Sequence, residues 1–262
     1  MEYDPLKDRA ARLIDLFPAL RKVFYRALDL ALLRQRYVKR LIRKYFKEAE
    51  TLRYHDAGAG LCQYSHYVLR NWPRSKVFAT DLKGDYLSAF AAFASAEGLS
   101  GFSWQSADLQ SFTPRSRYDL ITAIDILEHI GDDLAVLRNF HSCLAPGGLL
   151  IISTPSDRDV AARFTSEHVR PGYNKAELEA KLRSLGFEIL ESRFSYGKYG
   201  SLAWRLLIRN PLRLLDRTKL AVLLLPLYLA AVYPFAELLM QLDLATDNPS
   251  GTGIVIVARR GA

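Results

Sequence analysis

The sequence predicts an α/β protein with a doubly wound sheet that carries helices on both of its faces, and three observations lead to this fold class. Residues 52–62 combine a short apolar segment with an acidic residue and two alternating glycines, and a helix-like segment follows. Residues 118–125 form an apolar run of the kind that parallel strands need when both faces of a sheet are covered. A last apolar run, residues 254–258, supplies a further strand near the end of the chain.

Length and composition limit the possible classes of protein. At 262 residues the chain is long enough for one substantial domain with an added lobe. Half of the residues are apolar and 24% are charged, which is typical of a globular chain and excludes a disordered one. Two cysteines, Cys62 and Cys143, are too few for a disulfide framework and indicate a reducing, cytoplasmic setting. Residues 1–5 lack the apolar core of a secretory signal, so we expect none at this end.

The first expected strand ends at Asp56, and Gly58 and Gly60 follow it. Such a Gly-x-Gly turn lets the backbone approach a bound ligand at a point where a Cβ atom would collide with it. A dinucleotide-binding loop would need a further glycine at position 63, where this chain has Gln63. The turn therefore predicts a small-ligand site of another kind.

The next two expected strands also end in acidic residues. Residues 77–80 lead to Asp81 and Leu82, and Asp81 stands 21 residues after Gly60. An acid at the tip of this strand can accept paired hydrogen bonds from a ribose diol, although a simply solvated strand end is the alternative. Residues 102–105 lead to Asp108 and Leu109. The strand at 118–125 follows, and a turn at 144–148 then precedes a buried strand at 149–153.

In this order, residues from about 50 to 195 resemble the class I S-adenosylmethionine-dependent methyltransferases, close to their small-molecule and quinone-modifying branches. The resemblance implies a Rossmann-like sheet of seven strands and S-adenosylmethionine as the cofactor. It places the methionine portion at Gly58 and Gly60, the ribose at Asp81 and the adenine at Asp108. Many relatives have a third glycine at the position of Cys62. The implied cofactor-binding residues are Asp56, Gly58, Gly60, Asp81, Leu82, Asp108, Leu109 and Asp125.

The run Asp125-x-x-Glu128-His129 resembles an acid-x-x-Glu-His run of ubiquinone-type O-methyltransferases. It implies that Asp125 and His129 serve the acceptor, with His129 as a general base. Asp125, Glu128 and His129 are also a candidate site for Mg²⁺ or Mn²⁺, and the alternative is that they cap the next helix or bond the backbone. His168 is a second candidate for the catalytic base.

His168 belongs to residues 167–173, which follow the fifth expected strand and occupy the loop that closes over substrate in this family. Arg170 and Tyr173 are suited to position an anionic or aromatic group there. The alternative is a structural loop in which His168 caps the helix that follows.

The net charge of +8 is concentrated in two segments. Between Arg21 and Lys47 there are ten Lys or Arg residues and one acid, Asp29, with apolar residues at steps of three and four. This pattern predicts one amphipathic basic helix or a pair. Its surface suits an anionic membrane or a nucleic acid, or it simply solvates the outer face of the protein.

The second segment, residues 202–240, indicates a membrane contact. Residues 220–240 carry one charge, Glu237, and are long enough to span a bilayer. Pro226, Pro234 and Glu237 argue against a span, as does the strand beyond them. We therefore expect an insertion that enters one leaflet or roofs an apolar pocket, or else a soluble lid or dimer face. Arginine recurs beside Trp204 every four residues, at Arg205, Arg209, Arg213 and Arg217.

We thus expect four parts: basic helices over 1–48, the cofactor-binding core over 49–199, the helical insertion over 200–247 and the last core strand over 248–262. The predicted function is methyl transfer to a hydroxyl of an apolar or membrane-associated small molecule of lipid, isoprenoid or quinone type. The alternatives are another S-adenosylmethionine-using step of quinone metabolism and a non-catalytic, membrane-docked protein.

No nucleic-acid partner is expected, because residues 125–128 lack the Asn-Pro-Pro-Tyr-like run of nucleic-acid methyltransferases. The expected location is cytoplasmic, peripheral or monotopic on the inner face of the membrane.

Overall fold

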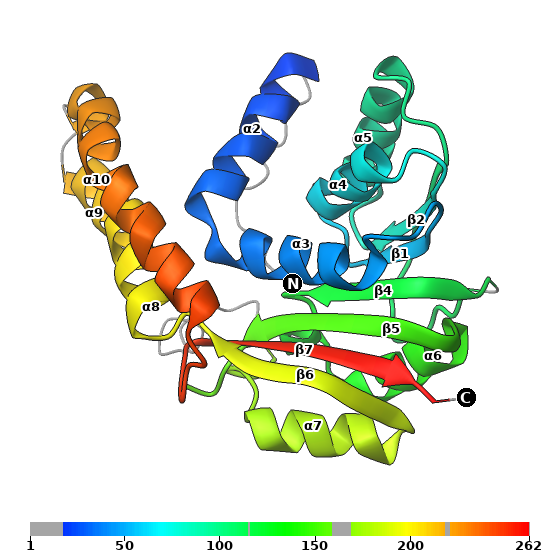
Figure 1. Ribbon diagram of the computed structural model, residues 1–262. Coiled ribbons are helices and arrows are strands. Elements are labelled where there is room, and N and C mark those ends of the chain that lie inside the picture. Colours follow the sequence, from blue (N-terminus) through cyan, green and yellow to red (C-terminus); the bar gives the residue numbers. More distant parts are fainter. Residues whose placement is uncertain (1–17, 115, 159–168, 218–220, 262) are drawn as a thin grey trace.

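The computed structural model describes residues 18–114, 116–158, 169–217 and 221–261. Its centre is one seven-stranded sheet with the strand order β3-β2-β1-β4-β5-β7-β6 (Figure 1). The strands are β1 (Arg53–Ala57), β2 (Lys76–Asp81), β3 (Phe102–Ser106), β4 (Tyr118–Ile124), β5 (Leu144–Pro155), β6 (Phe187–Ser195) and β7 (Gly253–Arg260). Neighbours among β1 to β5 pair in parallel, and β7 runs antiparallel between β5 and β6. The predicted α/β fold class with a seven-stranded sheet is confirmed.

Helices cover both faces of this sheet, as the apolar strands require. One face carries α3 (Leu33–Phe46), α4 (Gln63–Asn71) and α5 (Gly84–Ala96). The other face carries α6 (Asp133–Cys143) and α7 (Lys175–Ser184). The first strand pairs with both β2 and β4, so the order of the strands reverses at the crevice between β1 and β4. Ligands of open α/β sheets bind beyond the carboxyl ends of the strands at such a point.

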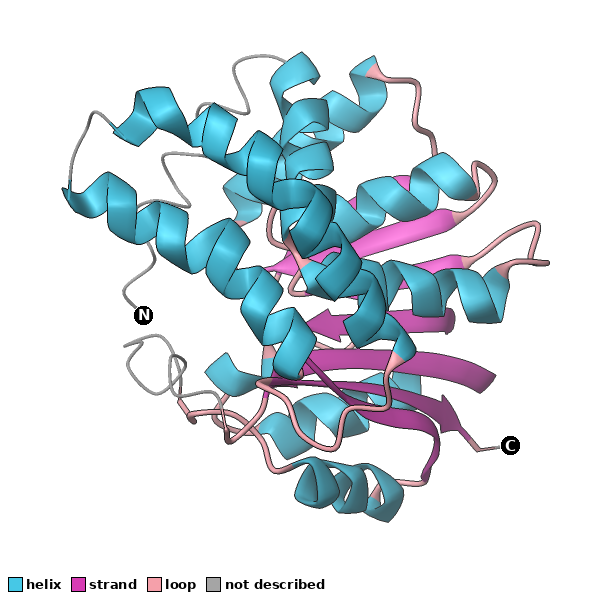
Figure 2. Cartoon of the chain, turned by 60° about the vertical axis from the view of Figure 1, so that its left-hand side comes forward, coloured by secondary structure: helices cyan, strands magenta, loops and turns pink. Residues whose placement is uncertain are grey.

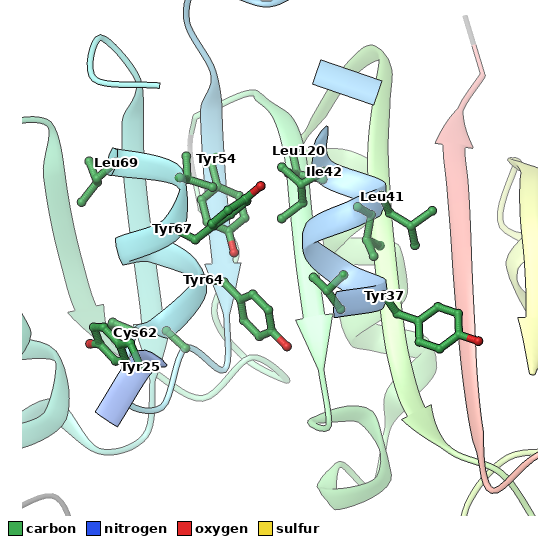
Figure 3. Close-up of a cluster of buried hydrophobic side chains, with 14 of the residues drawn as sticks. Tyr25, Tyr37, Leu41, Ile42, Tyr54, Cys62, Tyr64, Tyr67, Leu69 and Leu120 are labelled. Atoms are coloured by element: carbon green, nitrogen blue, oxygen red, sulfur yellow. The ribbon is translucent and has the colours of Figure 1, made fainter. Parts of the chain in front are cut away.

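The basic segment near the start forms two helices, α2 (Pro18–Ala31) and α3, which Leu32 separates with an extended backbone (φ −106°, ψ 110°). Figure 3 shows how α3 is held: Ile42 extends toward β4, where Leu120 lies, with Tyr54 of β1 nearby, and Leu41 lies on the side of α3 that faces β5 and β7. Each of these side chains is at most 6% exposed. Burial of such side chains stabilises the fold by about 1.5–3 kcal/mol each, so α3 is an integral layer of the core.

The insertion before β7 is a helical lobe that extends away from the carboxyl ends of the strands (Figure 1). It consists of α8 (Lys198–Trp204), a π-helical turn over Arg205–Arg209, α9 (Asn210–Arg217) and α10 (Ala221–Ala245). Figure 2 shows α9 and α10 side by side, and the Tyr228 hydroxyl of α10 donates to the Leu206 carbonyl at 3.0 Å. We call residues 198–245 the C-terminal lobe.

We expected the prolines of this lobe to interrupt its helices, and the structure shows that they do not. The helix α10 runs through both Pro226 and Pro234, and α9 contains Pro211. The π-helical turn ends where the Asn210 amide donates to the Arg205 carbonyl, five residues back, just before Pro211.

Candidate functional site

The glycine loop after β1 is fastened to the end of β2. The Gly58 and Ala59 amides both donate to the Thr80 carbonyl, at 2.8 and 3.0 Å. The Gly60 amide donates to Asp81 Oδ2 at 2.8 Å, and the Lys83 amide donates to the other oxygen, Oδ1, at 2.9 Å. The loop and the predicted ribose acid therefore form one unit at the carboxyl edge of the sheet.

The two glycines of this loop are needed for different reasons. Both have a left-handed backbone, with φ +72° at Gly58 and +51° at Gly60. A Cβ atom on Gly58 would lie 2.7 Å from Ile126 Cγ1, whereas no heavy atom outside the adjoining residues lies within 4 Å of a Cβ on Gly60. Gly58 thus permits close packing against the segment after β4, and Gly60 leaves open space in front of the loop.

Asp56, a predicted cofactor-binding residue, lies beneath the loop and is 2% exposed. Its Oδ2 atom accepts from the Ser65 amide at 3.0 Å and from the Ser65 hydroxyl at 2.7 Å. Burial raises the pKa of its carboxyl group to about 6, and the hydrogen bonds from Ser65 oppose that shift. This carboxylate joins β1 to the first turn of α4. We therefore propose that Asp56 positions the glycine loop and does not contact a ligand directly.

The other predicted cofactor residues lie along the edge formed by β2 and β3. Asp81 is half-buried, and Leu82 beside it is 49% exposed. The Ala107 amide donates to the Asp81 carbonyl at 3.0 Å, which brings the exposed Asp108 next to this strand end. Leu109 is buried. An exposed carboxylate and an exposed leucine at a strand edge can contact the polar edge and the face of a purine.

Asp125, the first residue after β4, forms an ion pair that no sequence pattern predicts. Its backbone is left-handed (φ 48°), and its carboxylate pairs with the guanidinium group of Arg34 in α3. Arg34 also donates its backbone amide to the Tyr196 hydroxyl at 3.1 Å. One basic residue among ten in that segment carries no signal that would single it out, so sequence reasoning missed it.

Two buried polar atoms beside this ion pair lack a hydrogen-bond partner within the described residues: Arg34 Nε and the Tyr64 hydroxyl. Burial raises the pKa of the Tyr64 phenol, and the positive charge of Arg34 opposes the increase. Buried polar atoms are rarely left without a partner, so a polar ligand group at this position would satisfy them.

The candidate metal ligands do not converge. Glu128 is 1% exposed and accepts from the Thr154 hydroxyl at 3.0 Å, while its carbonyl accepts from the Val169 amide at 2.9 Å. His129 is half-buried in the short 3₁₀ turn Leu127–His129. Across the described ranges, no group of three His, Cys, Asp or Glu side chains is arranged to hold a metal ion. The structure therefore does not support Asp125, Glu128 and His129 as a magnesium or manganese site.

His168 lies outside the described residues, but the end of its loop is described. The Arg170 guanidinium donates to the Leu127 carbonyl at 2.7 Å and to the Tyr173 hydroxyl at 2.6 Å. The Tyr173 hydroxyl in turn donates to Asp133 Oδ2 at 2.6 Å. Arg170 and Tyr173 thus anchor the loop to the segment after β4, which differs from the expected role of positioning a ligand group.

Comparison with known proteins supports this reading of the glycine loop. A family model described as a methyltransferase domain matches residues 31–192, more than half of the chain. The trans-aconitate 2-methyltransferase of Azoarcus sp. is 27% identical over 104 residues, which cover 40% of this chain and 39% of that protein. The ubiquinone biosynthesis O-methyltransferase of Bradyrhizobium sp. is 30% identical over 66 residues, 25% of this chain and 26% of that protein.

Solved structures show the same fold at low identity. The phosphoethanolamine N-methyltransferase 2 of Haemonchus contortus, in complex with S-adenosyl-L-methionine, is 17% identical and has a TM-score of 0.60 over 86% of this chain and 53% of that chain. The chain spans 39% of the length of the trans-aconitate 2-methyltransferases that it matches first. The family model, the seven-stranded sheet and the glycine loop agree, and the chain belongs to the class I S-adenosylmethionine-dependent methyltransferases.

Proposed function

We propose that this protein transfers a methyl group from S-adenosylmethionine to a hydroxyl of an apolar, membrane-associated small molecule of lipid, isoprenoid or quinone type. The observation that carries the proposal is the glycine loop fastened to Asp81 at the point where the strand order reverses. A ligand bound there contacts backbone, a half-buried carboxylate and open space within one site.

The residues of the chain fit this cofactor. The open side of Gly60 leaves room for the methionine portion, because nothing lies where its side chain would be. Each oxygen of Asp81 accepts one backbone amide and has a lone pair left for a ribose hydroxyl. We propose that Asp108, which is exposed next to the end of β2, accepts from an adenine amino group. When bound, the cofactor supplies an electrophilic methyl group whose leaving group is a neutral thioether.

The acceptor side is the region of Asp125, Arg34 and His129. We propose that Arg34 and Asp125 orient the reacting groups and that His129 takes the acceptor proton, with His168 as a second candidate for that role. The match to a ubiquinone biosynthesis O-methyltransferase supports a hydroxyl acceptor of apolar type.

The C-terminal lobe supports an acceptor held at a membrane. Leu223–Ala245 is long and apolar enough to cross a bilayer, and 17% of its most apolar stretch is buried within the protein. A single helix of this kind is weak evidence for a span, and the chain returns after it to β7 in the central sheet. We therefore propose a peripheral or monotopic attachment on the cytoplasmic face of the membrane.

The test uses methyl-labelled S-adenosylmethionine, a membrane lipid extract and the matched water-soluble extract. We expect label to enter the organic phase with the wild-type chain and not with Asp81→Ala. In calorimetry, Asp81→Ala should weaken binding of S-adenosylhomocysteine by about 1–3 kcal/mol through loss of charge-assisted hydrogen bonds. Asp119→Ala is the control, because Asp119 pairs with Arg53 at the opposite, amino edge of the sheet.

Equal affinity of the wild type and Asp81→Ala would contradict the cofactor site. Label that enters only water-soluble products would contradict an apolar acceptor while leaving the methyltransferase activity in place.

A further inference from the structure

A cavity of about 420 Å³ opens where β5 and β6 end and where the chain returns from the C-terminal lobe to β7. The backbone that lines it is tightly packed, because two of its glycines leave no room for a side chain. A Cβ atom on Gly197 would lie 2.2 Å from Asn248 Oδ1, and one on Gly251 would lie 2.2 Å from the Ser195 carbonyl oxygen. The cavity is therefore a feature of the folded core edge.

Three cations line this cavity: Arg158, Lys198 and Arg205. Among the described residues, no carboxylate lines the cavity and none of the three cations forms an ion pair. Aromatic rings support two of them, since Lys198 Nζ lies 4.7 Å from the ring centre of Tyr199 and the Arg158 guanidinium lies 5.8 Å from that of Phe194. Three cations around a concave surface favour a compact dianion such as a phosphate group.

The cavity adjoins the acceptor side through Tyr196, which forms part of its wall. The Tyr196 hydroxyl accepts from the Arg34 amide at 3.1 Å, and the Arg34 side chain is paired with Asp125. A ligand whose charged group lies in this cavity thus has its neighbouring atoms close to the end of β4.

At its other side the cavity reaches the C-terminal lobe through Leu202 and Arg205. Leu202 is 39% exposed, and farther along the lobe Leu212 is 52% exposed. An anionic cavity ligand with an apolar chain could therefore lay that chain on the lobe without burying a charge.

We propose that this cavity binds the phosphate group of a lipid phosphate and that this lipid is the methyl acceptor. The acceptor assignment rests on the methyltransferase function proposed above, whereas phosphate binding does not. Lys198 and Arg205 contact the phosphate, Arg158 completes the positive rim, and Tyr196 lies between the phosphate and the reacting end.

Calorimetry of the full chain with dihexanoyl phosphatidic acid, below its micelle concentration, tests this proposal. We expect Lys198→Gln with Arg205→Gln to weaken binding about tenfold or more, because two charge-assisted contacts are lost. The control, Arg74→Gln with Lys76→Gln, removes the same charge at exposed positions near the other end of the sheet and should bind as the wild type does. Inorganic phosphate should compete weakly, and dihexanoyl phosphatidylcholine should bind less tightly than the phosphatidic acid.

Equal affinity of the wild type, the cavity variant and the control would overturn the site. Inorganic phosphate that binds as tightly as the phosphatidic acid would overturn a lipid as the source of the phosphate. All three proteins should bind S-adenosylhomocysteine equally, so a failure of the cavity site is distinguishable from a failure of the cofactor site.

Discussion

At the scale of single residues, the candidate site depends on two glycines with similar backbone angles and different surroundings. The Cβ position of Gly58 is filled by Ile126, whereas that of Gly60 faces open space. Replacement by alanine should therefore separate a packing requirement from a ligand-binding requirement.

We predict that Gly58→Ala lowers the free energy of unfolding by about 2–4 kcal/mol, from left-handed strain together with overpacking against Ile126. Gly60→Ala should lower it by about 1 kcal/mol, because only the strain applies. Binding of S-adenosylhomocysteine should nevertheless fall in Gly60→Ala, since its methyl group enters the open space. Urea unfolding, with calorimetry of the folded variants, measures both effects. A Gly60→Ala protein that binds as the wild type does would show that the cofactor does not occupy this space.

The residues of the glycine loop could be predicted from the sequence, but the structural role of each one could not. The alternation of Asp56, Gly58 and Gly60 marks a ligand loop, yet the burial of Asp56 depends on Ser65, whose position is fixed by the packing of α4. The pairing of Arg34 with Asp125 joins residues 91 positions apart, and only the docking of α3 on the sheet brings them together. Such contacts between distant parts of the chain leave no periodic signal.

At the scale of elements, α10 is fixed to α3 by a hydrogen-bonded ion pair. Arg36 donates to both oxygens of Glu237, at 2.7 and 2.6 Å, and the Tyr233 hydroxyl donates to Oε2 at 3.0 Å. In the sequence, Glu237 argued against a membrane span, because a charge within this apolar run would lie in or near hydrocarbon. The structure adds that this acid has a partner on the core, Arg36.

This ion pair predicts a pH dependence. The hydrogen bonds from Arg36 lower the pKa of Glu237 to about 2, although partial burial opposes the shift. A carboxyl group with a lowered folded-state pKa stabilises the protein above its unfolded-state pKa, and that contribution is lost as the pH falls toward 2. Glu237→Gln should therefore lower the free energy of unfolding by about 1–2 kcal/mol at pH 7, after allowance for its partial exposure. The difference from the wild type should narrow between pH 4.5 and 2.

The matched control is Glu188→Gln, which breaks the more exposed pair with Arg259 on neighbouring strands. It should change the urea midpoint at pH 7 much less. If both variants lose the same free energy of unfolding, the ion pair between α3 and α10 contributes no more than an exposed pair does. Apolar packing alone would then hold the lobe.

At the scale of the whole molecule, the sequence was sufficient for the sheet and its edge. The apolar runs and the acidic strand ends mark the carboxyl edge, because parallel strands of a doubly wound sheet end together there. The structure of the C-terminal lobe could not be predicted as well from the sequence, since helix propensity alone predicts breaks at Pro226 and Pro234. Contacts of α10 with α8 and α9 stabilise a continuous helix in spite of the two lost backbone hydrogen bonds.

The lobe has an outer surface that a soluble domain would rarely expose. Leu223, Leu224 and Leu227 of α10 are 75%, 59% and 71% exposed, and Leu212 of α9 lies on the same lobe. Arg213, which is next to Leu212 in the chain, is exposed as well. Apolar side chains beside arginines are typical of a helix that lies among lipid headgroups.

We predict that the protein floats with liposomes, more strongly as their anionic lipid content rises and less strongly as salt is added. A triple variant with Leu223→Ser, Leu224→Ser and Leu227→Ser should reduce binding to neutral and anionic liposomes alike, because all three substitutions remove apolar surface that the membrane would bury.

A double variant with Arg209→Gln and Arg213→Gln should reduce only the part of the binding free energy that depends on anionic lipid, by about 1 kcal/mol per residue. The pair Arg74→Gln and Lys76→Gln carries the same charge change outside the lobe and should float as the wild type does. Carbonate washing should release the protein if, as we propose, the lobe does not cross the bilayer; Glu237 and the return to β7 tie it to the core. Equal flotation of all variants would instead make this surface a lid or an interface between two copies of the chain.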